Sequence, residues 1–587
     1  MANIPRIPTS ITGQSWHWRG GNGDAQDDLR PDDLVTQLLI ARGCEREDLA
    51  LHRTPSIRNF MPDPAIYRDM EAAAKRLADA LQADETITIF GDYDVDGATS
   101  AALLVRLLRE LGREPGVYIP DRLMEGYGPS GEALVRLAQA GSQLIVTVDC
   151  GAQAFEALDM AREAGVDVIV VDHHKCASTL PAAFALVNPN RLDETHDAAA
   201  HGHLAAVGVA FLLGAALIRE LRSRGWFTVR AEPKLLDLLD LVALGTVADV
   251  AQLRGLNRAF VAQRLKVMAQ GRNVGLVALA QVSRLTRAPL CHDLGFALGP
   301  RINAGGRVGK SDLGVRLLTT TDEGEAAAIA AQLDMLNAER RAIEAEVQAQ
   351  AEDMAARQDN HAVLLVAGEG WHPGVIGIVA GRLKEKFRRP ALVIALDEEG
   401  VGKGSGRSVS GVDLGAAILA AKDSGLLLAG GGHAMAAGLT VASGGVAVLH
   451  EFLDDRLHAD VGRAMQERTL LIDALVSPAG VQPDLVEAME GAGPFGTGWP
   501  APRLATGPVR IIKADVVGTG HVRLVVAGED GKSLKAVAFR QAESELGQAL
   551  LGAGRDRRLW IAGRAKLDEW NGRRAAEMHI DDAAWAG

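Results

Sequence analysis

Apolar and polar positions alternate along the first half of the chain in blocks that predict strands followed by helices. Short apolar runs at 86–90, 143–148 and 166–171 have the length and branched side chains of buried strands. Stretches with helical periodicity occupy 98–111, the surroundings of 155–163, and 234–250, which leads into a loop at Asp249. This order predicts an α/β domain with a mostly parallel sheet. The residues before about Asp63 carry frequent Pro and Gly, and we expect them to be loop-rich.

Three different patterns follow in the second half. The stretch from Asp322 to about Gln358 is rich in Ala, Glu and Gln and predicts one long helix capped by Asp322. A second α/β unit comes next, with Gly-rich segments at 400–408 and 429–438 that are expected to be turns. Beyond about Leu470, short β-like pieces separated by turn signals predict a small β-barrel, for which the OB-fold is a reasonable candidate.

These patterns divide the chain of 587 residues into five parts. We expect an N-terminal extension (1–60), a parallel-sheet α/β catalytic domain (61–321) and a connecting helix (322–358). A smaller α/β substrate-binding domain (359–465) and an OB-like nucleic-acid-binding barrel (466–587) complete the chain. The division agrees with the length, which exceeds what one hydrophobic core usually organises.

The amino-acid composition limits the possible classes of protein only slightly. The formal net charge is −13, which would not suggest a nucleic-acid partner, although a basic groove can exist on an acidic protein. The apolar runs are too short to span a membrane and the N-terminus lacks the pattern of a signal peptide, so we expect the protein in the cytoplasm. The four cysteines form no CxxC pair and are interpreted as small buried apolar residues.

The chemistry of the chain is concentrated at the ends of the predicted strands. Carboxylates and imidazoles gather there: Asp92, Asp94, Asp96, Asp149, His173, His174 and Asp249. In open α/β sheets, ligands bind outside the carboxyl ends of the strands. Oxygen ligands with imidazole suit Mg²⁺ or Mn²⁺, and two such ions can clamp a phosphodiester and generate a hydroxide nucleophile.

Two competing motifs are less convincing. The segment DYDVDG matches the start of an EF-hand loop, but its twelfth position is Leu103 where Glu is required, and it follows a strand. The segment GGRVGKS resembles the end of a P-loop, but Ala304 occupies the position of the required first glycine. A single Asp at a strand end is more often a turn residue or cap, so the argument depends on the joint placement of the set.

The order of the motifs resembles a known family. GDYDVDG at Gly91, VDCG at Val148, VDHH at Val171 and GTVADV at Gly245 are similar to the motifs of the DHH phosphoesterases. PRINAGGR at Pro300, WHPGVIGIVAGRL at Trp371, GSGRS at Gly404 and GGGHAMAAG at Gly430 resemble the bacterial RecJ branch of that family. The resemblance runs from about Ile57 to the C-terminus, and it implies a DHH domain, a DHH-associated domain and an OB-like barrel.

The resemblance also implies an activity and a set of site residues. It implies exonucleolytic hydrolysis of single-stranded DNA from the 5′ end to 5′-mononucleotides, with two Mn²⁺ or Mg²⁺ ions. The implied metal ligands are Asp94, Asp96, Asp149, His173 and Asp249, with Asp149 as the bridge, His174 facing the scissile phosphate and Asp172 supporting the ligands. Phe90 occupies the place of a histidine found in many relatives, which leaves open whether Asp92 binds metal directly.

Further contacts are implied with the strand and with other proteins. Arg301, Asn303 and Arg307 would contact the DNA backbone near the metals, and Ser405, Arg407 and His433 would hold the 5′-terminal nucleotide or its phosphate. The C-terminal stretch interleaves Trp560 and Trp570 with seven basic residues, and these tryptophans are expected either to stack on DNA or to lie in the barrel core. We expect a monomer that does not bind a membrane. The resemblance implies single-strand-binding protein and a RecQ-type helicase as partners.

Two other functions remain open. A phosphodiesterase for oligonucleotides or cyclic dinucleotides would use the same metal chemistry and would not need the C-terminal barrel. A non-catalytic single-strand-binding scaffold is the alternative from another class, but all seven side chains of the metal set are present.

Overall fold

The structure is a computed structural model, and it describes residues 7, 9–19, 31–121, 125–126, 128–268, 271–554, 557–568 and 574–586. The described chain forms two compact units. The larger unit consists of Pro62–Ala251 and Arg264–Glu467, and the smaller unit consists of Met1–Met61, Gln252–Gln263 and Arg468–Gly587. Among the described residues, no helix combines the length and apolarity needed to cross a membrane.

The first sheet of the larger unit has five parallel strands in the order β3-β2-β4-β5-β6. The strands are β2 (Ile87–Gly91), β3 (Gly116–Tyr118), β4 (Leu144–Val148), β5 (Asp167–Val171) and β6 (Ala185–Val187). Every residue of β2 and β4 is buried, which explains their continuous apolar runs. The prediction of a parallel α/β sheet is therefore confirmed.

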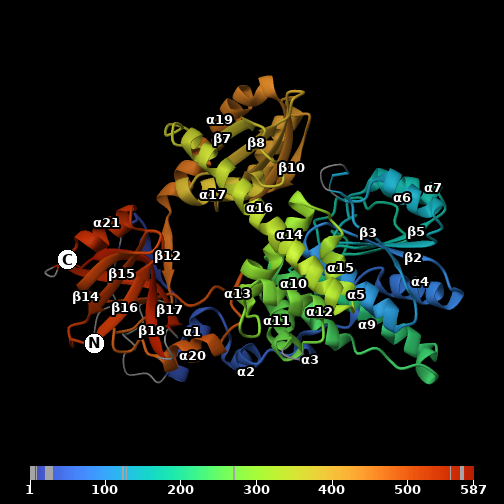
Figure 1. The fold of residues 1–587 in the computed structure, drawn as a ribbon, viewed down its shortest axis with the longest axis horizontal. Coiled ribbons are helices and arrows are strands. Elements are labelled where there is room, and N and C mark those ends of the chain that lie inside the picture. Colours follow the sequence, from blue (N-terminus) through green and yellow to red (C-terminus); the bar gives the residue numbers. More distant parts are fainter. Residues whose placement is uncertain are drawn as a thin grey trace. The chain divides into compact units, whose positions relative to one another are not determined.

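Helices cover both faces of this sheet (Figure 1). One face carries α6 (Gly131–Gln139) and α7 (Phe155–Glu163), and the other carries α4 (Met70–Ala83), α5 (Val95–Glu110) and α9 (Ala206–Ser223). The further helices of this part are α8 (His196–Ala199), α10 (Leu239–Ala248), α12 (Val274–Val282), α13 (Cys291–Asp293), α14 (Gly299–Val308) and α15 (Leu313–Thr319). The segment of the Asp-rich motif is only partly a loop, because α5 already includes Asp96.

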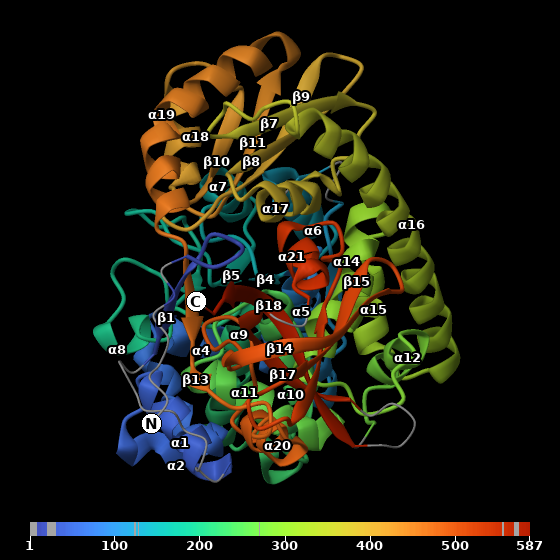
Figure 2. The same cartoon turned by 90° about the vertical axis from the view of Figure 1, so that its left-hand side faces the viewer.

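The long helix is α16 (Glu323–Ala355), and the side chain of Asp322 caps it by accepting a hydrogen bond from Glu325 N. It contacts α12, α14 and α15 along its first part and α17 and β7 near its end. Figure 2 shows this course along the larger unit. The predicted long helix is thus present, and it ends three residues earlier than expected.

The second sheet of the larger unit is mixed, with the order β10-β11-β9-β8-β7. Its elements are β7 (Leu364–Glu369), α17 (Ile376–Phe387), β8 (Ala391–Leu396), β9 (Val401–Arg407), α18 (Leu414–Asp423), β10 (Ala429–His433), β11 (Ala436–Ala442) and α19 (Val446–Gln466). The prediction that the two Gly-rich segments are turns was wrong, because they form β9, β10 and β11. In β9 the glycines are the buried positions, and a Cβ on Gly404 would lie 2.7 Å from the Leu439 side chain. Glycine is needed there for close packing of the sheet rather than for a turn.

The smaller unit contains a closed five-stranded barrel, in which β14 pairs with both β15 and β17. Its elements are β13 (Ala474–Leu475), α20 (Pro483–Gly491), β14 (Leu504–Val517), β15 (His521–Ala527), β16 (Ser533–Ala538), α21 (Glu545–Gly552), β17 (Arg558–Asp568) and β18 (Ala575–Trp585). The predicted C-terminal barrel is confirmed, although β18 was not foreseen.

The N-terminal residues belong to the same unit as the barrel. The chain forms β1 (Ser15–Trp18), α1 (Pro31–Ala41), α2 (Leu49–Arg53) and α3 (Ile57–Phe60), and β1 pairs with β12 (Thr469–Ile472). The first part of α11 (Gly255–Met268) also belongs here. The expectation of a loop-rich start was therefore wrong for the described residues. It overlooked a helix that begins at a proline, followed by two acidic residues and a buried stripe, Leu34, Val35, Leu38 and Leu39.

Candidate metal centre and nucleic-acid site

The parallel sheet brings three aspartates to one edge because each follows the end of a strand. The backbone N–H of Asp92 donates to Val148 O, that of Asp149 to Val171 O, and that of Asp172 to Val187 O. These bonds continue the strand ladders by one residue, so the three side chains lie at neighbouring strand ends. All three are buried.

Two more elements deliver the remaining ligand candidates. Asp94 caps α5 by accepting from Gly97 N, which places Asp96 in the first turn of that helix. The fully buried Asp96 carboxylate accepts hydrogen bonds from Ala206 N (2.7 Å) and Val207 N (3.0 Å) at the start of α9. Backbone N–H groups at a helix start favour the charged form of a carboxylate there. Asp249 lies at the end of α10.

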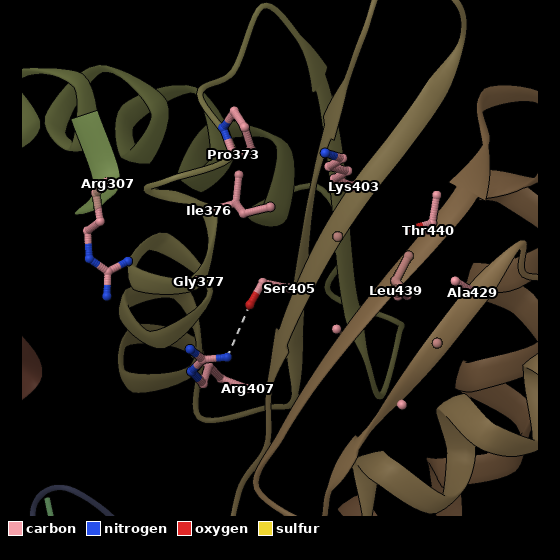
Figure 3. Close-up of a pocket in the computed structure, with 14 residues that line it drawn as sticks. Arg307, Pro373, Ile376, Gly377, Lys403, Ser405, Arg407, Ala429, Leu439 and Thr440 are labelled. Carbon is pink, nitrogen blue, oxygen red and sulfur yellow. Dashed lines mark hydrogen bonds between the residues drawn. The ribbon is translucent and has the colours of Figure 1, made fainter. Parts of the chain in front are cut away.

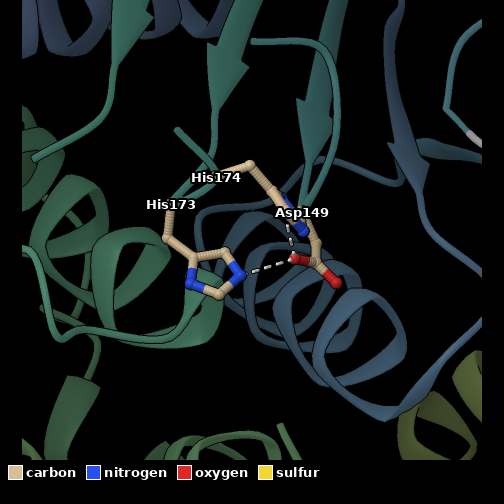
Figure 4. A group of neighbouring side chains, drawn as sticks. All are labelled: Asp149, His173 and His174. Atoms are coloured by element: carbon tan, nitrogen blue, oxygen red, sulfur yellow. Dashed lines mark ion pairs between the residues drawn. The ribbon is translucent and has the colours of Figure 1, made fainter. Parts of the chain in front are cut away.

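The seven candidate side chains meet in three overlapping groups. The groups are Asp149 with His173 and His174, Asp96 with His173 and Asp249, and Asp92 with Asp94 and Asp149; in each, one donor atom per residue lies within 4.8 Å of the others. Asp149 and His173 each belong to two groups. Figure 4 shows both histidines turned toward the Asp149 carboxylate.

The hydrogen bonds of His173 suit a metal ligand. Its Nδ1 lies 3.1 Å from the carbonyl oxygen of Leu204, and because a carbonyl only accepts, Nδ1 carries the proton. The lone pair is then on Nε2, which lies 3.3 Å from Asp149 Oδ1 and makes no hydrogen bond within the described part of the chain. Metal-binding histidines commonly donate their second nitrogen to a carbonyl in this way.

The electrostatics of the site also fit cations. Burial and the neighbouring Asp96 and Asp94 raise the pKa of Asp249 to about 9, and burial with Asp96, Asp94 and Asp92 holds the pKa of Asp149 well above its usual value. Burial, followed by the neighbouring His174, lowers the pKa of His173 to about 4 and keeps its ring neutral. A crowded set of carboxylates with a neutral imidazole is the donor set that hard divalent cations require.

His174 and Asp172 form a separate pair beside the ligand set. Asp172 Oδ1 accepts from His174 Nδ1 at 2.7 Å and from two backbone N–H groups, and its Oδ2 accepts from Ala152 N. Burial opposes the charge on His174, but this hydrogen bond and the negative charges of Asp172, Asp249 and Asp96 together outweigh burial and raise the pKa of His174 to about 9. The His174 side chain is 39% exposed.

The backbone at Asp149 is strained. Its φ is +62°, in the left-handed region that costs a non-glycine residue roughly 1–3 kcal/mol. Gly151 follows with φ +110°.

A polar cavity of about 460 Å³ lies against the second sheet (Figure 3). It is lined by Arg307, Ser405 and Arg407 from the predicted set, and also by Lys403. Arg407 Nη1 donates to Ser405 Oγ at 3.1 Å, and Arg307 Nη1 donates to Gly374 O at 2.9 Å. Sequence reasoning missed Lys403, although strand alternation in β9 puts Lys403, Ser405 and Arg407 on one face.

The other residues predicted to contact DNA lie at different places in the structure. His433 ends β10, and burial, followed by the nearby Lys175 and His174, lowers its pKa. Asn303 and Arg307 are one turn apart on α14, and Gly306 of that helix packs on the backbone of Tyr93, between Asp92 and Asp94. Arg301 instead pairs with Asp334 of α16 at 2.8 Å.

The basic and aromatic C-terminal stretch is mostly engaged within the barrel. Trp560 is half-buried and packs against a cluster that includes Ala505 and Ala562, which favours the core interpretation. Arg558 pairs with Glu529, Arg564 with Asp581, and Arg574 with Glu487. Arg555, Trp570 and Arg573 lie outside the described residues.

The fold and this site define a DHH-type protein with a candidate metal centre. The model of the DHH family N-terminal domain matches residues 86–246, the DHHA1 domain matches 359–459, and the RecJ OB domain matches 472–582. The single-stranded-DNA-specific exonuclease RecJ of Dickeya dadantii is 38% identical over 561 residues, covering 93% of this chain and 95% of that protein. The chain belongs to the RecJ family.

Solved structures of the family agree. RecJ of Thermus thermophilus in complex with Mn²⁺ superposes with a TM-score of 0.77 at 29% identity, covering 94% of this chain and 75% of that one. The complex of the same protein with Mg²⁺ gives a TM-score of 0.71 at 28% identity, with the same coverage.

Proposed function

We propose that this protein is a metal-dependent exonuclease that degrades single-stranded DNA from its 5′ end and releases 5′-mononucleotides. The observation that carries the proposal is the convergence of five aspartates and two histidines at one sheet edge, in a chain of the RecJ family. Relatives in that family are single-stranded-DNA-specific exonucleases, and their solved structures hold Mn²⁺ or Mg²⁺.

Two divalent cations, Mn²⁺ or Mg²⁺, would be held by the overlapping groups. We assign Asp96, His173 and Asp249 to one ion and Asp92 and Asp94 to the other. Asp149 would be the shared ligand, because it groups with Asp92 and Asp94 and also with His173. Two such ions, when bound, stabilise the charge that develops on a phosphodiester and make water a better nucleophile. The assignment of Asp92 rests on its buried position beside Asp94 and Asp149.

His174 would contact the phosphate, and Asp172 would hold His174 in place. His174 is partly exposed and its Nδ1 is held by Asp172, which orients the ring's other nitrogen. We assign His174 to the scissile phosphate, where it would donate a hydrogen bond to a non-bridging oxygen. Asp172 would be a positioning residue, since four donors already occupy its carboxylate.

The cavity on the second sheet would receive the 5′ end of the strand. Arg307, Lys403 and Arg407 give it three cationic side chains, and Ser405 adds a hydroxyl. Arginine binds phosphate oxygens through two parallel N–H groups, so this lining suits a terminal phosphate. His433 would help to hold the 5′-terminal nucleotide or its phosphate, and Asn303 would contact the DNA backbone near the metals. Arg301 would contact the backbone only after leaving Asp334.

The barrel would bind single-stranded DNA further along. Strand pairing places Arg523, Val537, His579 and Arg564 in one row across β15, β16, β18 and β17. Phe539, 48% exposed, lies beside this row with ring centroids 5.2 Å from His521 and 4.8 Å from His579. Exposed aromatic rings beside basic side chains suit base stacking with backbone neutralisation.

The parts of the chain would divide this work. Residues 61–321 would carry catalysis, the helix at 322–358 would connect them to the substrate-binding residues 359–465, and 466–587 would retain the strand. The N-terminal extension 1–60 would support the barrel. The protein would act as a monomer in the cytoplasm, in DNA repair and recombination. Its partners would be single-strand-binding protein and a RecQ-type helicase.

Digestion of end-labelled single-stranded DNA tests the proposal. With Mn²⁺ present, a 5′ label should appear at once as mononucleotide, whereas a 3′ label should remain on progressively shorter strands. EDTA should stop both reactions. Rapid cleavage of dinucleotides with intact long strands would replace the proposal with the small-substrate phosphodiesterase, and tight strand binding without turnover would replace it with the non-catalytic scaffold.

A further inference from the structure

A second cluster of metal-ligating side chains lies in the second α/β domain, away from the catalytic set. His361 lies in the segment between α16 and β7, and His450 and Asp454 lie one turn apart on α19. One donor atom from each lies within 4.8 Å of the other two. The family motifs do not include these residues, and the proposed catalysis does not use them.

The hydrogen bonds of this cluster leave metal-binding lone pairs available. His450 Nε2 lies 2.8 Å from Val363 O, and because a carbonyl only accepts, Nε2 carries the proton and Nδ1 carries the lone pair. Asp454 Oδ1 accepts from Val363 N at 2.9 Å. The backbone of one residue, Val363, therefore holds both side chains. Metal ligands are commonly held by such hydrogen bonds to neighbouring groups.

The contact between His361 and Asp454 is an ion pair without a hydrogen bond. His361 Nδ1 is buried and lies 3.3 Å from Asp454 Oδ2, yet it makes no hydrogen bond within the described residues. Charge-assisted hydrogen bonds are shorter, about 2.7–2.9 Å. Two ligands of one tetrahedral zinc ion, each bonded at about 2.0–2.1 Å, would be separated by about 3.3 Å.

We propose that His361, His450 and Asp454 form a binding site for a transition-metal ion of the Zn²⁺ type. Two imidazoles and one carboxylate suit zinc better than Mn²⁺ or Mg²⁺, which prefer oxygen. The ligands come from two elements that are distant in sequence, so a bound ion would fasten the segment entering β7 to α19. Arg389 already holds that segment by donating to Gln358 O at 2.8 Å and to His361 O. The ion would add a cross-link where the long helix joins the second sheet.

Cobalt serves as the probe, because tetrahedral Co²⁺ absorbs visible light strongly and six-coordinate Co²⁺ absorbs weakly. The metal-depleted full-length protein is titrated with Co²⁺, and bound metal per chain is measured after gel filtration. We expect one strongly absorbing ion that Zn²⁺ displaces. His361→Ala should lose this ion, and Asp454→Asn should lose it while keeping an acceptor for Val363 N. His458→Ala, an exposed histidine on the same helix, should retain it.

Two variants separate this site from the catalytic one. Asp149→Asn should retain the strong Co²⁺ absorption, and His361→Ala should keep the Mn²⁺-dependent activity of the unaltered protein. Zn²⁺ should raise the thermal midpoint of the unaltered protein more than that of His361→Ala. The proposal is overturned if the unaltered protein shows no strong Co²⁺ absorption, or if that absorption persists in both His361→Ala and Asp454→Asn.

Discussion

At the scale of single residues, the burial of neighbouring carboxylates in the candidate metal cluster is expected to oppose folding when no cation is bound. Asp149 combines a left-handed backbone with a buried carboxylate that faces other carboxylates. Burying charge without a partner is costly, so such a group persists only where function requires it. Asp172 shows the opposite case. Its hydrogen bonds and the charges of His174 and His173 together outweigh burial and lower its pKa to about 2.

Asp149→Asn should therefore separate stability from activity. Removing one buried charge should raise the thermal midpoint of the metal-free protein, and loss of the shared ligand should reduce hydrolysis by about 10³-fold or more, a loss of several kcal/mol of transition-state stabilisation. Calorimetry in EDTA and single-turnover cleavage with Mn²⁺ measure the two effects. Asp159→Asn, on the exposed side of α7, is the matched control and should change neither. A variant of Asp149 that cleaves at the normal rate would contradict the metal assignment.

His52 gives the smaller unit a dependence on pH. Its ring packs on Trp499 with centroids 4.4 Å apart, and burial with the nearby Arg258 and Arg42 lowers its pKa from 6.5 to about 4. Between these values the unfolded chain binds a proton that the folded chain does not. Stability should therefore fall as the pH drops from about 6.5 to 4, with a slope of at most about 1.4 kcal/mol per pH unit.

Urea unfolding followed by tryptophan fluorescence tests this dependence. His52→Phe keeps an aromatic ring against Trp499 but cannot titrate. The difference in unfolding free energy between the unaltered protein and this variant should shift in favour of the variant below pH 6.5. A difference that does not change with pH would show that His52 is not the group responsible.

At the scale of elements, the ends of strands and the starts of helices build the site. β2, β4 and β5 deliver Asp92, Asp149 and Asp172, while the first turn of α5 holds Asp96 against the start of α9. The close approach of the Asp-rich segment to α5 depends on a glycine. A Cβ on Gly97 would lie 2.4 Å from the backbone oxygen of Asp92.

Gly97→Ala should therefore damage the site although alanine favours helices. The added methyl group meets backbone that cannot move away as a side-chain end could, so Asp92 and Asp94 must shift. We expect a loss of stability of about 1–3 kcal/mol, typical of overpacking, together with weaker Mn²⁺ activation of cleavage. Gly462→Ala in α19, where a Cβ meets nothing within 4 Å, should be neutral or stabilising. Equal behaviour of the two variants would contradict the packing argument.

At the scale of the whole molecule, the barrel cannot be removed cleanly by truncating the C-terminus. The smaller unit combines both ends of the chain with Gln252–Gln263. The apolar stripe of α1 shares a core with α20 and the barrel strands. Deleting residues after 467 would expose that stripe to water.

Fragments 1–467 and 62–467 should therefore behave differently. The first keeps the exposed leucines of α1 and should aggregate, because exposed apolar patches promote association. The second lacks them, and both keep Gln252–Gln263, so that segment does not distinguish the two. Light scattering and size-exclusion chromatography compare the fragments at equal concentration. A monodisperse fragment 1–467 would show that α1 does not need the barrel for cover.

Sequence patterns alone predicted the parallel sheet, the long helix, the barrel and the gathering of the Asp and His side chains at the strand ends. Buried strands have continuous apolar runs, helices repeat every 3.6 residues, and polar residues at strand ends meet because parallel strands point the same way. The Gly-rich strands and α1 could also have been predicted from the sequence. Lys403, Ser405 and Arg407 alternate with glycine, and α1 carries a regular apolar stripe. They were missed because glycine and proline were interpreted as turn signals.

Contacts between residues that are far apart in the chain required the folded structure. The association of the N-terminal residues with the barrel, the engagement of Arg301 by Asp334, and the meeting of His361 with His450 and Asp454 join residues far apart in the chain. Local sequence patterns do not predict such contacts, because they depend on how helices and sheets pack after they have formed. The pKa shifts at Asp149 and His174 have the same origin. Burial and neighbouring charges, rather than residue type, determine which of these side chains is charged.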